Sequence, residues 1–195
     1  MPSELITKLN WVDILMIIAI VRIVYIGARQ GFVVEFSKIL GLVIALVVAY
    51  HYYIGFSNIV VSGSPIPTGF SDLICFSSLL GLIVLAFKFI REGLALIIKA
   101  EPIPILHTWG GLLLGALRAW IFISVFAYIF LVSGFGYLEK TTRQSYSVNH
   151  IINVSPQIYA YSFDNIISKF FPSEKINNVV FNIISGSQEK QKRPQ

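Results

Sequence analysis

The sequence predicts an all-α integral membrane protein with four transmembrane helices, followed by short C-terminal amphipathic helices. Composition gives the first reason, because 55% of the 195 residues are hydrophobic, 13% are charged and the mean hydropathy is +0.74. The second is four long apolar stretches, each about long enough to cross hydrocarbon as a helix: Trp11 to Ala28, Phe36 to Ile54, Leu73 to Ile90 and Leu106 to Val132. Hydrocarbon offers no water to backbone groups, so the stretches must be helical.

Polar segments separate these stretches. The first stretch ends in the glycine-containing segment 27–31, and the second is followed by segment 62–69, whose two prolines and small polar residues favour a turn outside the hydrocarbon. The third stretch gains Lys88, Arg91 and Glu92 near its end, which is typical of the membrane interface. The cluster from Tyr50 to Tyr53, which includes His51, is interpreted as a membrane boundary, because amphipathic rings prefer the headgroup layer.

We divide the chain into a transmembrane domain over residues 1–136, an amphipathic helical region over 137–186 and a disordered basic tail over 187–195. Two short helices are expected in the middle part: Ser155 to Pro172, Ser173 to Ile184. Each carries an apolar stripe at helical spacing. The stripes predict packing against the bundle or the bilayer surface, with docking of a soluble partner as the alternative.

Small residues recur at four-residue spacing inside the apolar stretches. They are Ser37, Gly41, Ala45 and Ala49 in the second, Gly111, Gly115 and Ala119 in the fourth, and Gly27 with Gly31 at the end of the first. Such stripes allow close approach of helices in lipid. The alternative is that glycine lines a pore or a sliding contact. We also expect exposed stripes of this kind to support self-association.

Arg118 is the main charged residue within an apolar stretch. A charge at a helix centre costs roughly 2.5 to 3.5 kcal/mol on insertion scales, so we expect Arg118 to point into the bundle toward a carboxylate. Asp13, Glu35 and Glu92 are the candidates, and Glu35 is preferred because it begins a helix with its own small-residue stripe. A structural clamp is the favoured interpretation, and a transport or gating role is the alternative.

The sequence predicts no catalytic residue, no cofactor and no metal site. One cysteine, Cys75, and three scattered histidines provide no metal-ligand spacing, and nucleophile elbows and phosphate loops are absent from the sequence. The net charge of +5 comes from basic residues that flank apolar segments, where they orient helices and meet anionic headgroups. A nucleic-acid partner is therefore not expected, whereas the lipid bilayer is.

The order of several motifs resembles the colicin V production family of bacterial inner-membrane proteins. Trp11-Val12-Asp13, Gly31 and Glu35 fit the first part of its pattern, and Gly111, Gly115 and Arg118 fit the last membrane helix. Three residues differ from the family's pattern. His107 and Thr108 stand where the pattern has an Asp-Arg pair, and Ala119 preserves only the small size of a glycine. The resemblance implies four membrane helices, involvement in colicin V production or export and in envelope stress tolerance, and no established catalytic residues.

We therefore predict a non-enzymatic accessory protein of the bacterial inner membrane that supports toxin or bacteriocin production or export and envelope homeostasis. The alternative is a small channel or transporter formed by self-association. Expected partners are further copies of the chain or other membrane proteins, without a small-molecule substrate. The basic residues Arg29, Lys38, Lys88, Arg91 and Lys99 favour two cytoplasmic turns and two periplasmic termini, whereas Lys8, Lys140 and Arg143 favour the opposite orientation.

Overall fold

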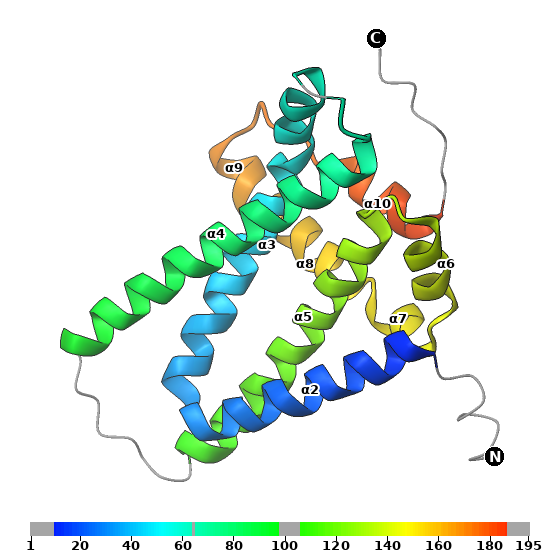
Figure 1. Ribbon diagram of the computed structural model, residues 1–195. Helices are drawn as coiled ribbons and strands as arrows, with labels where there is room; N and C mark the ends of the chain where they lie inside the picture. Colours follow the sequence, from blue (N-terminus) through cyan, green and yellow to red (C-terminus); the bar gives the residue numbers. More distant parts are fainter. Residues whose placement is uncertain (1–9, 64, 98–105, 187–195) are drawn as a thin grey trace.

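The computed structural model describes residues 10–63, 65–97 and 106–186, and the regular structure in this part of the chain is helical (Figure 1). Four helices are long and apolar enough to cross a membrane. They are α2 (Trp11–Gln30), α3 (Phe32–Ser62), α4 (Thr68–Ile97) and α5 (Gly111–Val132), which the π-helical turn η1 (Leu106–Gly110) precedes. The predicted fold class is thereby confirmed. The expected tail, Lys8 and Lys99 lie outside the described residues.

The four long helices pack as two pairs, and one helix, α5, connects the pairs. α3 lies along α4 and α2 lies along α5, and α5 also contacts α3. In its most apolar window, 44% of the residues of α5 are buried, against 11% in α4. α5 is therefore the inner helix and α4 the outermost one. Figure 1 shows α2, α3 and α5 meeting at one end of the molecule, while the end of α4 diverges from them.

The small-residue stripe of α3 is used inside the chain. Ala45 and Ala49 are fully buried, and a Cβ added to Gly41 would lie 2.8 Å from the Cβ of Phe87 in α4. Close packing of α3 on α4 is the physical result. Gly41, Ala45 and Ala49 are buried within the chain, so this part of the stripe is not exposed for self-association.

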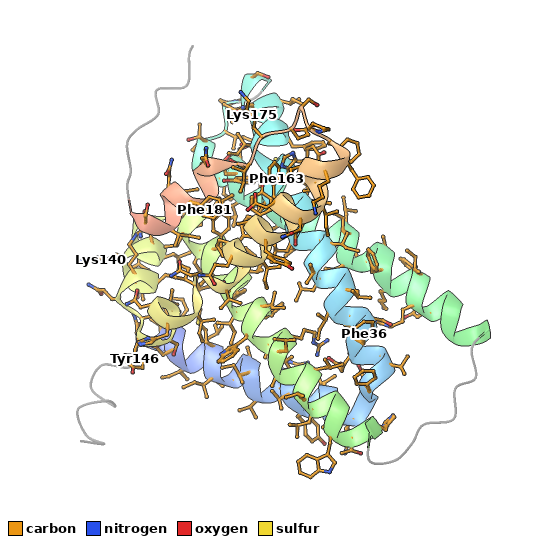
Figure 2. All side chains as sticks on the ribbon, turned by 180° about the vertical axis from the view of Figure 1, so that it is seen from behind. Phe36, Lys140, Tyr146, Phe163, Lys175 and Phe181 are labelled. Atoms are coloured by element: carbon orange, nitrogen blue, oxygen red, sulfur yellow. The ribbon has the colours of Figure 1, made fainter. Side chains whose placement is uncertain are left out.

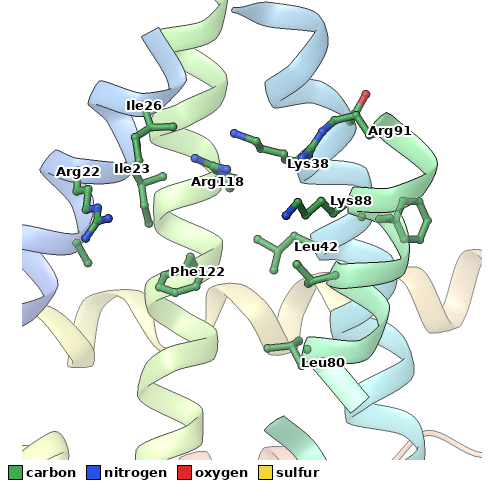
Figure 3. A pocket seen from close by; sticks show the side chains of 16 residues that line it. Arg22, Ile23, Ile26, Lys38, Leu42, Leu80, Lys88, Arg91, Arg118 and Phe122 are labelled. Atoms are coloured by element: carbon green, nitrogen blue, oxygen red, sulfur yellow. The ribbon is translucent and has the colours of Figure 1, made fainter. Parts of the chain in front are cut away.

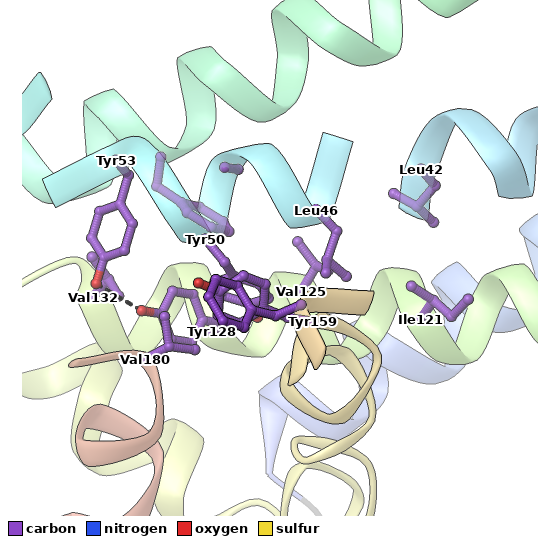
Figure 4. Close-up of a cluster of buried hydrophobic side chains, with 13 residues drawn as sticks. Leu42, Leu46, Tyr50, Tyr53, Ile121, Val125, Tyr128, Val132, Tyr159 and Val180 are labelled. Atoms are coloured by element: carbon purple, nitrogen blue, oxygen red, sulfur yellow. Dashed lines mark hydrogen bonds between the residues drawn. The ribbon is translucent and has the colours of Figure 1, made fainter. Parts of the chain in front are cut away.

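An aromatic cluster forms the core between α3, α4 and α5 (Figure 4). Tyr50, Tyr53, Phe76 and Tyr128 are all fully buried. The rings of Tyr50 and Tyr128 pack edge to face with centroids 4.7 Å apart, a favourable arrangement. The hydroxyls of Tyr53 and Tyr128 share a 2.9 Å hydrogen bond, and that of Tyr50 bonds with Ser155 Oγ at 2.8 Å.

The interpretation of residues 50–53 as a membrane boundary is wrong for two of the tyrosines. Tyr50 and Tyr53 point into the core, where their hydroxyls have partners, and α3 continues to Ser62. Tyr52 alone among the three tyrosines is substantially exposed, at 47%. Helical spacing of three residues places Tyr50 and Tyr53 on one face, and that face is turned inward.

Six short helical segments follow the last long helix. They are α6 (Gly136–Gln144), α7 (Tyr146–Ile151), α8 (Val154–Ser162), η2 (Phe163–Ile167), α9 (Ser168–Phe170) and α10 (Asn178–Ser185). The helix expected from Ser155 to Pro172 corresponds to the run from α8 to α9. The second expected helix begins at Asn178 instead of Ser173, because Asn177 is extended, caps the N–H of Val179 and donates from Nδ2 to the carbonyl of Tyr50.

These C-terminal helices pack against the bundle, which is the first of the two sequence interpretations. Tyr159, Phe163 and Val180 join the aromatic core, and Figure 2 shows Phe163 and Phe181 where the helices lie across the bundle. Only part of the predicted apolar stripe is covered, because Ile166 is 57% exposed and Phe170 is 76% exposed.

Candidate functional site

A glycine contact joins α2 to α5 at the end where three helices meet. A Cβ added to Gly27 would lie 2.7 Å from the carbonyl oxygen of Gly111 and 2.8 Å from the Cα of Gly115. Any side chain larger than hydrogen would therefore push the two backbones apart. Gly111 and Gly115, both expected from the sequence to promote close packing, lie at this crossing.

Gly31 forms the turn between α2 and α3 and positions Glu35. Its φ of +83° is a conformation that favours glycine, and the ring of His107 lies where a Cβ would be. The Gly31 N–H donates to the carbonyl of Gly27, and its own carbonyl accepts from the N–H of Glu35. The turn thus starts α3 close to α5, where the Glu35 side chain meets Arg118.

Glu35 is fully buried between two cations, and one of them is the predicted partner. Arg118 Nε lies 3.0 Å from Oε2 of Glu35, and Lys38 Nζ lies 2.6 Å from Oε1. The Arg118–Glu35 ion pair expected from the sequence is therefore present. The Nε–H bond of Arg118 does not point at Oε2 of Glu35. Neither of these two atoms therefore has a hydrogen-bond partner among the described residues. Lys38 additionally contacts the amide oxygen of Gln30.

The ion cluster faces an open cavity of about 730 Å³ that is lined by residues of α2, α3, α4 and α5 (Figure 3). Basic side chains from all four helices line it: Arg22, Lys38, Lys88, Arg91 and Arg118. Figure 3 shows Lys38, Lys88 and Arg118 directed into this space. The rest of the lining is mainly apolar, and includes Leu42, Leu80 and Phe122. We call this feature the basic cavity.

Asp13 lies far from the basic cavity, near the other end of α2. Eighteen residues of helix separate it from Gly31, or about 27 Å at 1.5 Å per residue. The carboxylate is fully buried and accepts hydrogen bonds from Ser145 Oγ at 2.7 Å, the N–H of Ser147 at 2.8 Å and the N–H of Asn10 at 2.9 Å. The structure thus groups Gly31, Glu35, Gly111, Gly115 and Arg118, and leaves Asp13 in a separate site that anchors α2 to the α6–α7 turn.

A polar bridge fixes the C-terminal helices to α3. His51 bonds through Nδ1 with the hydroxyl of Tyr159 at 3.0 Å and through Nε2 with Glu174 at 3.1 Å. The Tyr159 hydroxyl also accepts the N–H of Asn177 at 3.1 Å. Burial raises the pKa of the Tyr159 phenol, and the Asn177 hydrogen bond opposes that effect only in part. His51 is therefore a bridging residue in the structure.

Several members of these sites were missed in the sequence. Lys38 could have been found, because it lies three residues after Glu35 on the same helix face. Ser145 and Ser147 carry no charge and lie more than a hundred residues from Asp13, so no local signal identifies them. Within the described residues, no group of three His, Cys, Asp or Glu side chains could hold a metal ion.

Comparison with known proteins identifies one family. The model of the family described as Colicin V production protein matches residues 12–156. The matched region contains the four long helices, the basic cavity and the Asp13 site, and it ends inside α8. No curated protein and no solved structure matches the chain significantly.

Proposed function

Because the chain belongs to the Colicin V production protein family, we propose that it is a non-enzymatic accessory protein of the bacterial inner membrane. Its role is to support production or export of a bacteriocin-type toxin and to maintain the cell envelope. The observation that carries this proposal is the family match, which spans the whole membrane region. Four helices able to cross a membrane support a multi-pass location.

Distribution of basic residues supports the proposed orientation. Arg29 and Lys38 flank the α2–α3 turn, and Lys88 and Arg91 lie near the end of α4, which places four basic residues toward one membrane face. The positive-inside rule assigns this face to the cytoplasm and the start of α2 to the periplasm. The orientation is tested with a reporter that functions only in the cytoplasm, fused after Gln195. Activity of this fusion contradicts the proposed orientation.

Genetic complementation tests the role. A strain that makes colicin V and lacks its own family protein is expected to secrete less toxin and to survive detergent poorly, and this chain is expected to restore both properties. Restoration by the wild-type chain and by the control Arg29→Gln, at equal membrane abundance, supports the proposal. Unchanged secretion and survival after deletion of the family protein contradict it.

Partner proteins are a further part of the proposal. An accessory protein acts by holding other components, so we expect copurification of further copies or of other membrane proteins from native membranes. The exposed apolar residues Ile166 and Phe170 of the C-terminal helices offer contact area for such components or for lipid. Mass determination of the intact assembly identifies the subunits.

A small channel or transporter is the second candidate, and the basic cavity is the observation that favours it. Beyond Leu42 the interior is filled by the aromatic core, with Leu46, Tyr50 and Tyr128 buried. A continuous path through one chain would therefore need the core to open. Flux measurements in liposomes separate the two candidates, because selective flux that disappears in Arg118→Ala supports a channel, whereas absence of flux supports the accessory role.

A further inference from the structure

Positive charge is in excess in the basic cavity. Five cationic side chains line it, whereas the ion pairs there involve only two carboxylates, Glu35 and Glu92. Glu92 lies 3.8 Å from Lys88, and both side chains are more than half exposed, so that pair is weak. Among the described residues, Arg22 and Arg91 have no ion-pair partner. An anion inside the cavity would compensate charges that are otherwise expensive near hydrocarbon.

The cations are distributed over a depth that a lipid headgroup can reach. Lys38 lies about 9 Å along α3 from its first residue, and Lys88 lies about 3 Å before Ile90, the last residue of the third apolar stretch. These positions are near the boundary between headgroups and hydrocarbon, because the headgroup layer is about 5 to 8 Å thick on each side. Arg118 lies deeper, about 16 Å along the helix from His107. Its guanidinium can therefore pull a phosphate below the usual headgroup level.

The deeper wall of the cavity is apolar. Leu42, Leu80 and Phe122 line it, and a Cβ added to Gly81 would meet no atom within 4 Å. α4, which forms this side, is the outermost helix and is mainly exposed where the bilayer would be. A site with cations at one end and hydrocarbon-like walls below fits an amphiphile better than a free hydrophilic anion, which would leave the apolar wall without a partner. The cavity volume is in the usual range for ligand sites.

We propose that the basic cavity is a binding site for an anionic phospholipid. The phosphate lies among Lys88, Arg91 and the free donors of Arg118, and the first part of the acyl chains lies along Leu42, Leu80 and Phe122. Glu35 holds Arg118 and Lys38 in position and is a positioning residue for the phosphate site. This inference rests on the observations at the cavity alone, and the lipid-binding test below does not require the proposed role in toxin production.

Lipid titration followed by native mass spectrometry tests the proposal. The intact protein in mild detergent is titrated with phosphatidylglycerol and, separately, with phosphatidylcholine of the same acyl chains. Phosphatidylglycerol is expected to bind at least tenfold more tightly. Arg91→Gln and Lys88→Gln are each expected to lower the affinity for phosphatidylglycerol about tenfold, which corresponds to about 1.4 kcal/mol of binding free energy.

Two further variants separate a built site from general surface charge. Arg29→Gln removes a charge at the same membrane face, but this exposed guanidinium lies over the ring of Tyr25 outside the cavity, so affinity is expected to change less than twofold. Gly81→Leu changes no charge and fills the apolar part of the cavity. It is expected to weaken phosphatidylglycerol binding about tenfold while the unfolding temperature is maintained.

Three results would overturn the proposal. Equal affinity for the two lipids would show that the headgroup charge is not recognised, and an equal loss in Arg29→Gln and Arg91→Gln would assign the effect to the surface potential. Displacement of the lipid by millimolar inorganic phosphate, together with unchanged binding in Gly81→Leu, would identify a site for a free anion instead of a lipid.

Discussion

The two ends of α2 each lie beside a buried carboxylate, but the two carboxylates have opposite surroundings. Asp13 accepts three hydrogen bonds from neutral donors and has no cationic partner among the described residues. Glu35 faces Lys38 and Arg118, and its Oε2 has no hydrogen bond in the described part of the chain. Asp13 is surrounded by protein, whereas the Glu35 cluster faces the basic cavity.

This difference separates an anchor from a binding site. A carboxylate whose acceptor capacity is used by backbone and serine donors can do little more than hold its neighbours together. A cluster with more cations than carboxylates, open to a cavity, has donors left for a ligand. We therefore assign a purely structural role to the Asp13 end, whereas the Glu35 end contributes both to fold stability and to recognition.

The largest effect is expected at Glu35. Glu35→Gln leaves Arg118 and Lys38 without a carboxylate, and removing one partner of a buried pair typically destabilises by about 3 to 5 kcal/mol. Thermal unfolding in detergent measures the loss for Glu35→Gln, Arg118→Gln and the double variant. The double variant is expected to lose less than the sum of the two single variants, and purely additive losses would show that the two side chains do not interact.

Asp13→Asn is expected to destabilise by about 3 kcal/mol, because the amide replaces a charged acceptor of three hydrogen bonds and turns a donor toward Ser145 or Ser147. Amide hydrogen exchange is expected to increase in α6 and α7 and to stay unchanged around Gly31. Faster exchange at Gly31 would contradict the separation of the two ends.

Gly27→Ala tests the close glycine contact between α2 and α5. Alanine normally stabilises a helix relative to glycine, but here its Cβ meets the backbone of α5, so we expect a net loss of about 2 kcal/mol. Gly55→Ala is the matched control, because a Cβ at Gly55 meets no atom within 4 Å. Similar unfolding temperatures for the two variants would argue against backbone contact at the crossing.

Tyr159→Phe is expected to lower the free energy of unfolding by about 1 kcal/mol, because the N–H of Asn177 and the ring of His51 lose a shared partner. The loss is expected to appear as earlier proteolysis of α8 to α10, with lipid binding in the basic cavity unchanged. Loss of lipid binding in this variant would show that the two regions are coupled.

The smallest effect concerns alkaline pH. The pKa of Tyr159 is raised in the folded protein, so above about pH 10 the phenol ionises in the unfolded chain first. The stability that Tyr159 provides is therefore complete below that pH and is lost as the pH rises further. The difference in unfolding free energy between wild type and Tyr159→Phe is expected to shrink above about pH 10, and a growing difference would contradict the assignment of the shift to burial.

Sequence reasoning reached the four spans and the Arg118–Glu35 pair for one physical reason. Hydrocarbon restricts what a chain can do, since it requires helices and requires a partner for each buried charge, and the sequence offers few carboxylates. Tyr50 and Tyr53 were misassigned although Tyr53 lies four residues after Ala49, in line with the small-residue stripe. Their shared face was available as a signal, whereas a run of adjacent aromatic residues suggested the interface.

Other features depend on how the helices are arranged. Lys88 and Arg91 reach the basic cavity because α4 packs along α3 and diverges at its end, and no sequence spacing describes that geometry. The partners of Asp13 come from the α6–α7 turn, whose residues show no unusual pattern. Any serine in the sequence could donate a hydrogen bond to Asp13. The actual donors can therefore be identified only in the folded structure.

The most direct test of a purely structural role for the Asp13 end, and of a recognition role for the basic cavity beside Glu35, compares Asp13→Asn with Arg91→Gln. Toxin secretion and detergent survival are measured in the complemented strain and divided by the amount of folded protein in the membrane. We predict that Asp13→Asn lowers the folded amount but keeps normal activity per folded molecule, whereas Arg91→Gln keeps the folded amount and loses activity per molecule. The reverse pattern, or equal activity per molecule in both variants, would contradict the assignment.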